Sequence, residues 1–218
     1  MKPQEARWAI VVPIKRLTVA KTRLSRSAEV RADLALAMAL DTVAAARTAA
    51  AVKFVVVVTD EPTAEQAVAA MGAVVVADEP DAGLNPALLH GARAAAASTS
   101  GLRIAALSSD LPALRPADLD GVLTAAMDHA CCLVADADGT GTTLLAAEDV
   151  AAFTPRFGPA SRRAHLDDGA YDVTSSASLS LRRDVDTVDD LHAAAELGLG
   201  PQTTAALRRH PLWAPAQP

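Results

Sequence analysis

Apolar residues occur along the first two thirds of the chain in short continuous runs, separated by longer Ala-rich segments. Five of these runs predict strands, at residues 8–12, 54–58, 73–76, 104–107 and 131–135. The runs are continuous rather than alternating, which is typical of strands covered by helices on both faces. The segments between them predict helices at 28–49, 63–71, 86–97 and 116–130. Strands that alternate with helices predict an α/β fold with a mostly parallel sheet.

The pattern changes in the last third of the chain. Residues 142–146 predict a strand paired with 131–135, and residues 158–168 predict a short helix. Residues 179–181 predict a late strand that ends at Asp184. We therefore expect an inserted or edge antiparallel section in the sheet.

Helix signals and prolines mark the C-terminal part. Thr187 begins the sequence T-V-D-D, which resembles a capping box and predicts a helix through Leu197. Residues 201–218 contain four prolines and predict a C-terminal tail. Because no linker, internal repeat or second core is visible, we expect residues 1–218 to form one domain.

Composition narrows the class of protein. Apolar residues make up 51% of the 218 residues and aromatic residues only 3%, so the core should consist of small and β-branched side chains. The net charge of −6 argues against a nucleic acid as the main partner but allows a single nucleotide. Cys131 and Cys132 are too few and too close for a disulfide framework. Because the sequence shows no signal-peptide or membrane-spanning pattern, we expect a soluble, cytoplasmic protein that does not bind a membrane.

Acidic residues at two predicted strand ends form the first candidate site. The run 104–107 leads directly into S-S-D-L-P-A-L, which places Asp110 at the carboxyl edge of the sheet, where open α/β folds bind ligands. Asp184 and Asp186 end the later run. Two such acidic ends can share one divalent cation, and Mg²⁺ favours carboxylate oxygens together with substrate phosphates. The alternative is that these acidic turns only cap helices.

A basic loop follows the first predicted strand. Lys15, Lys21 and Arg23 lie in the sequence P-I-K-R-L-T-V-A-K-T-R-L, in the loop that covers the ligand crevice of a doubly wound fold. There they could neutralise a triphosphate and its transition-state charge. The alternative is a solvated basic loop. The glycines of a P-loop and of a dinucleotide-binding fingerprint are absent.

Three further segments have both a structural and a functional interpretation. Asn85 is a natural N-cap before Pro86, or it reads a nucleobase beside Gly83, which allows close backbone approach. The turn-rich segment 136–143 is either a hairpin turn or a holder of a carboxylate or phosphate. Residues 156–161 lead into a helix whose N-terminal amides favour anions. We expect His165, on that helix, to lie at the surface.

No nucleophile elbow and no Ser-His-Asp set is present in the sequence, so covalent catalysis is not predicted. Carboxylates for a metal and cations for phosphates are the equipment of nucleotidyl transfer by in-line attack on an α-phosphorus, with pyrophosphate leaving. An acceptor that is already an anionic phosphate needs no general base.

Five motifs resemble those of the guanylyltransferases of coenzyme F-420 biosynthesis, and the resemblance as a whole runs from about residue 12 to residue 200. They are P-I-K-R-L-x-x-x-K-T-R-L, S-D-L-P-A-L, D-x-x-G-T-G-T, R-F-G-P-x-S and D-V-D-T. The resemblance implies a three-layer, Rossmann-like nucleotidyltransferase fold similar to that of the molybdopterin guanylyltransferases. It implies Mg²⁺, GTP and a phosphorylated three-carbon acid, with transfer of GMP to phosphoenolpyruvate that yields enolpyruvoyl-2-diphospho-5'-guanosine and pyrophosphate.

The resemblance also implies roles for particular residues. Asp110 and Asp184 match metal carboxylates of the family, with Asp186 close enough to assist. The matches to positions that hold the acceptor are Thr142, Gly158 and Ser161, and the matches to the phosphate-binding basic loop are Lys15, Lys21 and Arg23. This chain departs from the family in carrying Ser109 where a glycine is frequent.

Several alternatives remain open at this point. The acceptor could be 2-phospho-L-lactate, or the chain could be a related sugar-phosphate or molybdenum-cofactor nucleotidyltransferase. It could also be a non-catalytic nucleotide-binding module. The resemblance suggests a labile product and functional coupling to the transferase that acts next in the pathway. The sequence does not determine the oligomeric state, and a homodimer is one possibility.

Overall fold

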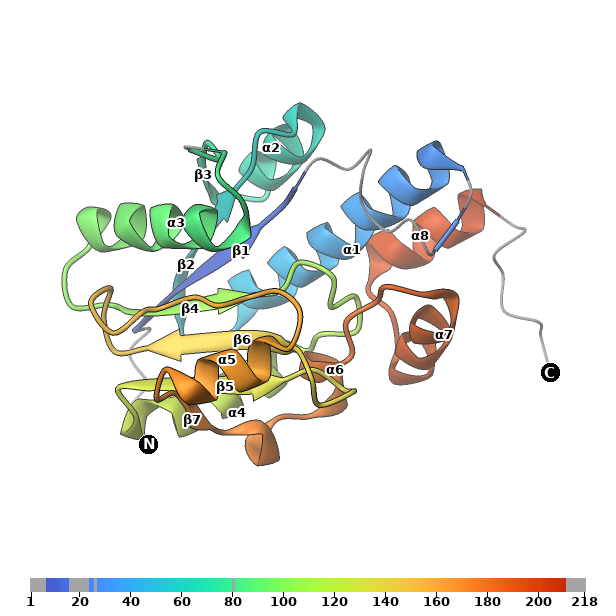
Figure 1. The fold of residues 1–218 in the computed structure, drawn as a ribbon. Coiled ribbons are helices and arrows are strands. Elements are labelled where there is room, and N and C mark those ends of the chain that lie inside the picture. Colours follow the sequence, from blue (N-terminus) through green and yellow to red (C-terminus); the bar gives the residue numbers. More distant parts are fainter. Residues whose placement is uncertain (1–6, 16–23, 26, 80, 211–218) are drawn as a thin grey trace.

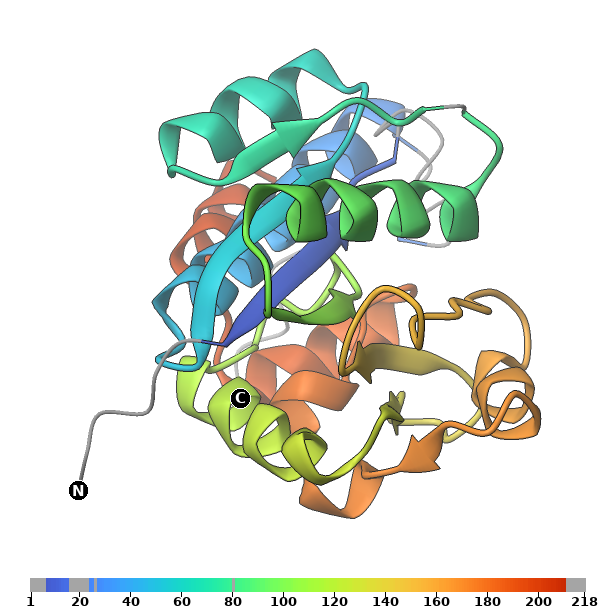
Figure 2. The same cartoon turned by 90° about the vertical axis from the view of Figure 1, so that its left-hand side faces the viewer.

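A computed structural model describes residues 7–15, 24, 25, 27–79 and 81–210. They form a seven-stranded sheet with helices on both faces (Figures 1 and 2). The strand order is β3-β2-β1-β4-β6-β5-β7. The strands are β1 Trp8–Pro13, β2 Val52–Val58, β3 Val74–Val76, β4 Arg103–Leu107, β5 Cys131–Ala135, β6 Thr142–Ala147 and β7 Tyr171–Asp172.

The first four strands run parallel, and β6 runs antiparallel to both of its neighbours, β4 and β5. The predicted pairing of residues 142–146 with 131–135 is therefore confirmed. The antiparallel strand lies inside the sheet, because β6 is inserted between β4 and β5. This reversal brings the start of β6 to the edge where β1, β4 and β5 end.

Eight α-helices surround the sheet in the described part of the chain. They are α1 Ala28–Thr48, α2 Pro62–Ala70, α3 Leu84–Ser98, α4 Pro116–Ala125, α5 Ser161–Asp167, α6 Leu179–Arg182, α7 Val188–Leu197 and α8 Pro201–Arg209. None of these helices is both long and apolar enough to cross a membrane.

Alternate residues of each central strand enter two separate cores. Ile10 and Val12 of β1 pack with α1, α2 and α4, whereas Val11 packs with α3 on the opposite face. The helix α3 approaches the sheet closely at Gly91, where a Cβ atom would lie 2.6 Å from side-chain carbons of Val11 and Val58. The prediction of a three-layer α/β fold with a mostly parallel mixed sheet is confirmed.

Two predictions for the C-terminal part are wrong. Residues 179–182 form the one-turn helix α6 instead of a strand. Leu181 is fully buried while Leu179 is half exposed, whereas residues two apart in a strand would share one face. Residues 201–209 form helix α8 instead of a tail, since Pro201 occupies the first helical position, where a missing N–H costs nothing. Residues 211–218 of that tail lie outside the described residues.

The helix α8 is held in place by a buried carboxylate of α1. The two carboxylate oxygens of Asp41 accept hydrogen bonds from the backbone N–H groups of Gln202 and Thr203, at 3.0 and 2.8 Å. Figure 1 shows α8 lying beside α1. The predicted capping box at Thr187 is confirmed, since its side chain and that of Asp190 bond to each other's backbone N–H groups.

Candidate active site

The candidate site lies at the edge of the sheet where β1, β4 and β5 end and β6 begins. The N–H of Ser108, directly after β4, donates to the carbonyl of Thr143 in β6 at 2.8 Å. This bond places the loop that carries Asp110 beside Thr142. The Asp110 carbonyl in turn accepts from the N–H of Val185 at 3.1 Å, which fixes the loop that carries Asp184 and Asp186 against it.

Two adjoining cavities open at this edge. The first, of about 210 Å³, is lined mainly by apolar side chains of β1, α1, α3 and β4, together with Lys15 and Asp110. The second, of about 670 Å³, is lined mainly by polar groups of the β5–β6 hairpin, the α5 N-terminus and the loop before α7. Leu84, Ser108 and Phe157 line both cavities. The two cavities thus share a wall.

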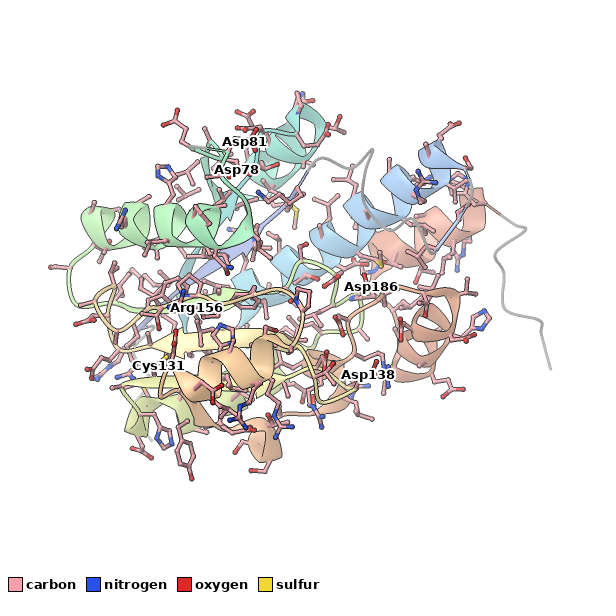
Figure 3. All side chains as sticks on the ribbon, viewed as in Figure 1. Asp78, Asp81, Cys131, Asp138, Arg156 and Asp186 are labelled. Atoms are coloured by element: carbon pink, nitrogen blue, oxygen red, sulfur yellow. The ribbon has the colours of Figure 1, made fainter. Side chains whose placement is uncertain are left out.

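Carboxylates crowd around Asp184. Burial raises its pKa to about 7, and the negative charges of Asp110, Asp136 and Asp186 add to this shift. Asp138 and Asp186 lie on neighbouring loops that face the second cavity (Figure 3). A divalent cation would relieve this repulsion, and carboxylate oxygens are the ligands that hard cations prefer, so the donor chemistry fits a divalent cation.

The geometry around Asp184 differs from the prediction in one respect. Asp184 follows the one-turn helix α6, so its carboxylate reaches the site from a loop and not from a strand end. Within the described ranges, no three acidic, histidine or cysteine side chains converge closely enough to hold a metal ion as they stand.

Lys15 extends from the end of β1 toward the loop after β3. Its Nζ atom lies 2.6 Å from the Oδ2 atom of Asp78, whose side chain is 9% exposed. The ion pair holds the lysine over the first cavity, which it lines. The other two predicted cations, Lys21 and Arg23, lie outside the described residues.

Thr142, Gly158 and Ser161 all line the second cavity, although they come from β6, a loop and α5. Behind Thr142 lies His165, which is buried, contrary to the prediction of a surface position. The Thr142 hydroxyl lies 3.0 Å from the imidazole Nδ1 atom, and the N–H of Arg156 donates to Nε2 at 2.8 Å. Burial lowers the pKa of His165 to about 4, so the imidazole is neutral at pH 7.

The N-cap of α3 is Gly83, whereas the sequence predicted Asn85. The backbone of Gly83 has a φ of 107°, a conformation that favours glycine. Asn85 lies within the first turn, and its side-chain amide bonds both ways to the backbone of Phe157. Its Nδ2 donates to the Phe157 carbonyl at 3.0 Å, and its Oδ1 accepts from the Phe157 N–H at 2.7 Å. Asn85 therefore positions the wall between the two cavities and lines neither of them.

Sequence reasoning missed the individual roles of Asp136 and Arg183. Asp136 directly follows β5, and its carboxylate accepts hydrogen bonds from the N–H groups of Thr140 and Gly141 at 2.9 and 2.7 Å. These bonds shape the hairpin that borders the second cavity. Arg183 lies 3.3 Å from Asp190 and brings a positive charge to the cavity lining. The position of Asp136 at the end of an apolar run was a signal of the same kind as that of Asp110.

Residues 8–210 match the family described as guanylyl transferase CofC like. Phosphoenolpyruvate guanylyltransferase of Thermomonospora curvata is 51% identical over 212 residues, which cover 97% of this chain and 93% of that protein.

Solved structures share the fold at low sequence identity. A nucleotidyl transferase from Methanothermobacter is 21% identical with a TM-score of 0.59, and covers 88% of this chain and 97% of its own. Rv0371c from Mycobacterium tuberculosis, in a complex with manganese, is 19% identical with a TM-score of 0.51, over 87% of this chain and 98% of its own. The fold is thus that of nucleotidyltransferases, and the match to the family model shows that this chain belongs to the guanylyl transferase CofC-like family.

Proposed function

We propose that this protein transfers GMP from GTP to phosphoenolpyruvate, with formation of enolpyruvoyl-2-diphospho-5'-guanosine and release of pyrophosphate, in coenzyme F-420 biosynthesis. The observation that carries the proposal is the pair of cavities with a common wall, one mainly apolar with Lys15 and Asp110 and one polar. The identity of about half of all residues with a phosphoenolpyruvate guanylyltransferase supports the choice of substrates. We expect the reaction to take place in the cytoplasm.

The reaction is a single displacement at the α-phosphorus of GTP. A phosphate oxygen of the acceptor forms the new P–O bond while the bond to the β-phosphate oxygen breaks, and pyrophosphate leaves with that electron pair. The acceptor phosphate is already an anion, so no side chain needs to remove a proton. What the protein must supply is alignment of the two substrates and neutralisation of charge.

Lys15, anchored by Asp78, would neutralise the triphosphate at the first cavity. We assign Lys21 and Arg23 to the same task, and Gly83 to close backbone approach to the nucleotide. Thr142, Gly158 and Ser161 would hold the carboxylate and phosphate of the acceptor in the second cavity. Asn85, which we expected beside the nucleobase, acts through the wall residue Phe157.

Asp110, Asp184 and Asp186 would hold a divalent cation, for which we propose Mg²⁺. When bound, such a cation neutralises charge on the α-phosphate and on the leaving pyrophosphate. The manganese complex of Rv0371c is a precedent within the same fold. The raised pKa of Asp184 also favours a cation here, because the crowded carboxylates repel one another without one.

The test is pyrophosphate release from GTP and Mg²⁺ with phosphoenolpyruvate, 2-phospho-L-lactate, a sugar phosphate or no acceptor. The downstream transferase and its deazaflavin acceptor are added in a parallel series to draw off a labile product. We expect release with phosphoenolpyruvate, its loss in Asp110→Asn, and its retention in the control Asp167→Asn, an exposed residue of α5 outside both cavities.

Other outcomes would point elsewhere. Faster release with 2-phospho-L-lactate would change the acceptor and leave the reaction class intact. Release only with a sugar phosphate would indicate a related nucleotidyltransferase. GTP binding that survives Asp110→Asn, without turnover in the wild type under any condition, would indicate a binding module and contradict the proposal.

A further inference from the structure

His165 touches the second cavity only through its neighbours. It comes from α5, is 1% exposed, and lies with its ring edge toward Phe157, at 5.1 Å between the ring centres. Each of its two nitrogens has a partner, since Nδ1 faces the Thr142 hydroxyl and Nε2 accepts from the N–H of Arg156. The imidazole thus connects the strand that carries Thr142 to the loop that leads to Gly158.

The hydrogen bonds of His165 determine where its proton lies. A backbone N–H can only donate, so the Nε2 atom that faces Arg156 must offer its lone pair. A neutral imidazole then carries its single proton on Nδ1. That N–H points at the Thr142 oxygen, and the nearby Ser161 carbonyl can share it.

The consequence falls on the Thr142 hydroxyl. A hydroxyl has one proton and two lone pairs, and its rotation ordinarily decides which of them a ligand meets. The Thr142 proton cannot point at Nδ1, because that atom already bears a proton. It is therefore free to point into the second cavity, which Thr142 lines.

We propose that His165 is a positioning residue whose Nδ1–H holds the Thr142 hydroxyl as a hydrogen-bond donor toward the anionic group of the acceptor. The inference rests on the proposed function, in which Thr142 binds that acceptor. It matters because the cavity lining is rich in carboxylates, namely Asp136, Asp138, Asp184, Asp186 and Asp190. A donor that is fixed in direction helps an anion to bind in such surroundings.

The first test is independent of activity. In a two-dimensional ¹H–¹⁵N spectrum that correlates ring protons with both imidazole nitrogens, His165 of the wild type should show a protonated Nδ1 and an unprotonated Nε2 at pH 7. The spectrum of His165→Asn identifies its signals by their loss. A ring protonated on Nε2, or on both nitrogens, would overturn the proposal.

The second test uses two variants that each keep one half of the imidazole. Asn can place an N–H where Nδ1 lies, whereas Gln can place an oxygen where Nε2 lies. We expect His165→Gln to raise the KM for phosphoenolpyruvate about tenfold to a hundredfold, the effect of one lost hydrogen bond to a charged group. His165→Asn should raise it several-fold less, and the KM for GTP should stay unchanged in both.

Thr142 supplies the control for the mechanism. Thr142→Val should raise the acceptor KM as much as His165→Gln does, and Thr142→Ser, which keeps a hydroxyl, should raise it less than Thr142→Val. The double variant Thr142→Val/His165→Gln should be no worse than Thr142→Val alone. Two results would mean that His165 serves only packing and would overturn the proposal. One is that the effects of Thr142→Val and His165→Gln on the acceptor KM add in the double variant. The other is that His165→Asn and His165→Gln change the KM values for both substrates equally.

The proposed function and this inference fail in different ways. A wild type that releases no pyrophosphate with any phosphorylated acid would overturn the proposed function, whatever the spectrum of His165 shows. A working enzyme with the wrong tautomer, or with additive variants, would overturn only the inference. If the His165 variants unfold, substitution of the other four histidines one at a time identifies the His165 signals of the wild type by elimination, and the tautomer then decides.

Discussion

Asp184→Asn should make the protein more stable and inactive at the same time. Asp184 is half-buried near the negative charges of Asp110, Asp136 and Asp186, and its pKa lies near 7 instead of its ordinary 3.8. At pH 8 the folded protein must therefore hold a charge that its surroundings disfavour. An amide of the same shape removes the charge, and with it the proposed ligand for a divalent cation.

The magnitude follows from the difference of about three pKa units, at about 1.4 kcal/mol each. An acid whose pKa is raised by folding contributes most to stability below pH 3.8, and this contribution falls as the pH rises to 7. The charge thus costs the wild type roughly 4 kcal/mol at pH 8 and roughly 2 kcal/mol at pH 5. We expect Asp184→Asn to gain up to these amounts, so its advantage should grow by about 2 kcal/mol between pH 5 and pH 8.

Stability is measured by urea unfolding of both proteins at pH 5 and pH 8 with EDTA present. Pyrophosphate release is measured separately, on the folded proteins with Mg²⁺. Mg²⁺ or Mn²⁺ at pH 8 should stabilise the wild type and have little effect on Asp184→Asn, because binding to the folded state raises stability by mass action. A variant that is no more stable than the wild type at pH 8, or an advantage that does not change with pH, would refute the reasoning about the crowded carboxylates.

Three further predictions concern stability. Folding lowers the pKa of His165 to about 4, so its effect on stability has the opposite pH dependence to that of Asp184. His165 should add up to about 3 kcal/mol to the free energy of unfolding as the pH rises from 4 to 6.5. Urea titrations at these two pH values should show this increase in Asp184→Asn and not in the double variant Asp184→Asn/His165→Gln. Asp41→Ala should cost about 1–2 kcal/mol, because two N–H groups of α8 lose their acceptor, and an unchanged midpoint of thermal unfolding would contradict this. Gly91→Ala should lower the free energy of unfolding by about 1–3 kcal/mol, because the added carbon overpacks the contact between α3 and the sheet. The control is Gly121→Ala on α4, where the added carbon meets nothing within 4 Å, and it should leave the midpoint of thermal unfolding unchanged or raise it.

The strands of the sheet could be predicted because buried parallel strands require continuous apolar runs, and these runs stand out in an Ala- and Val-rich chain. The elements that were predicted wrongly are short or begin with a proline. Leu179 and Leu181 lie two positions apart, a spacing that predicts one apolar face of a strand. The sequence could not show that only Leu181 is buried. The helix α8 was missed because Pro201 marks a helix start as readily as a loop, and because Asp41, which caps it, lies about 160 residues away.

The candidate site was predictable where a residue sits at a strand end or in a turn, as Asp110 and Thr142 do. Contacts between distant segments could not be predicted from sequence patterns. The bond of Asn85 to Phe157 spans 72 residues, so the N-cap interpretation was the natural one from local sequence. His165 lies on a seven-residue helix, too short for its apolar pattern to tell a buried face from an exposed one.

In the proposed function, one site joins GMP to a phosphorylated three-carbon acid. The most direct measurement is ³¹P NMR of the protein with GTP, Mg²⁺ and phosphoenolpyruvate. We expect two mutually coupled phosphoanhydride signals, one from the α-phosphorus of GTP and one from the phosphorus of phosphoenolpyruvate, which appear together with an equal amount of pyrophosphate. Unchanged GTP, or GMP formed at the same rate with and without phosphoenolpyruvate, would contradict this function.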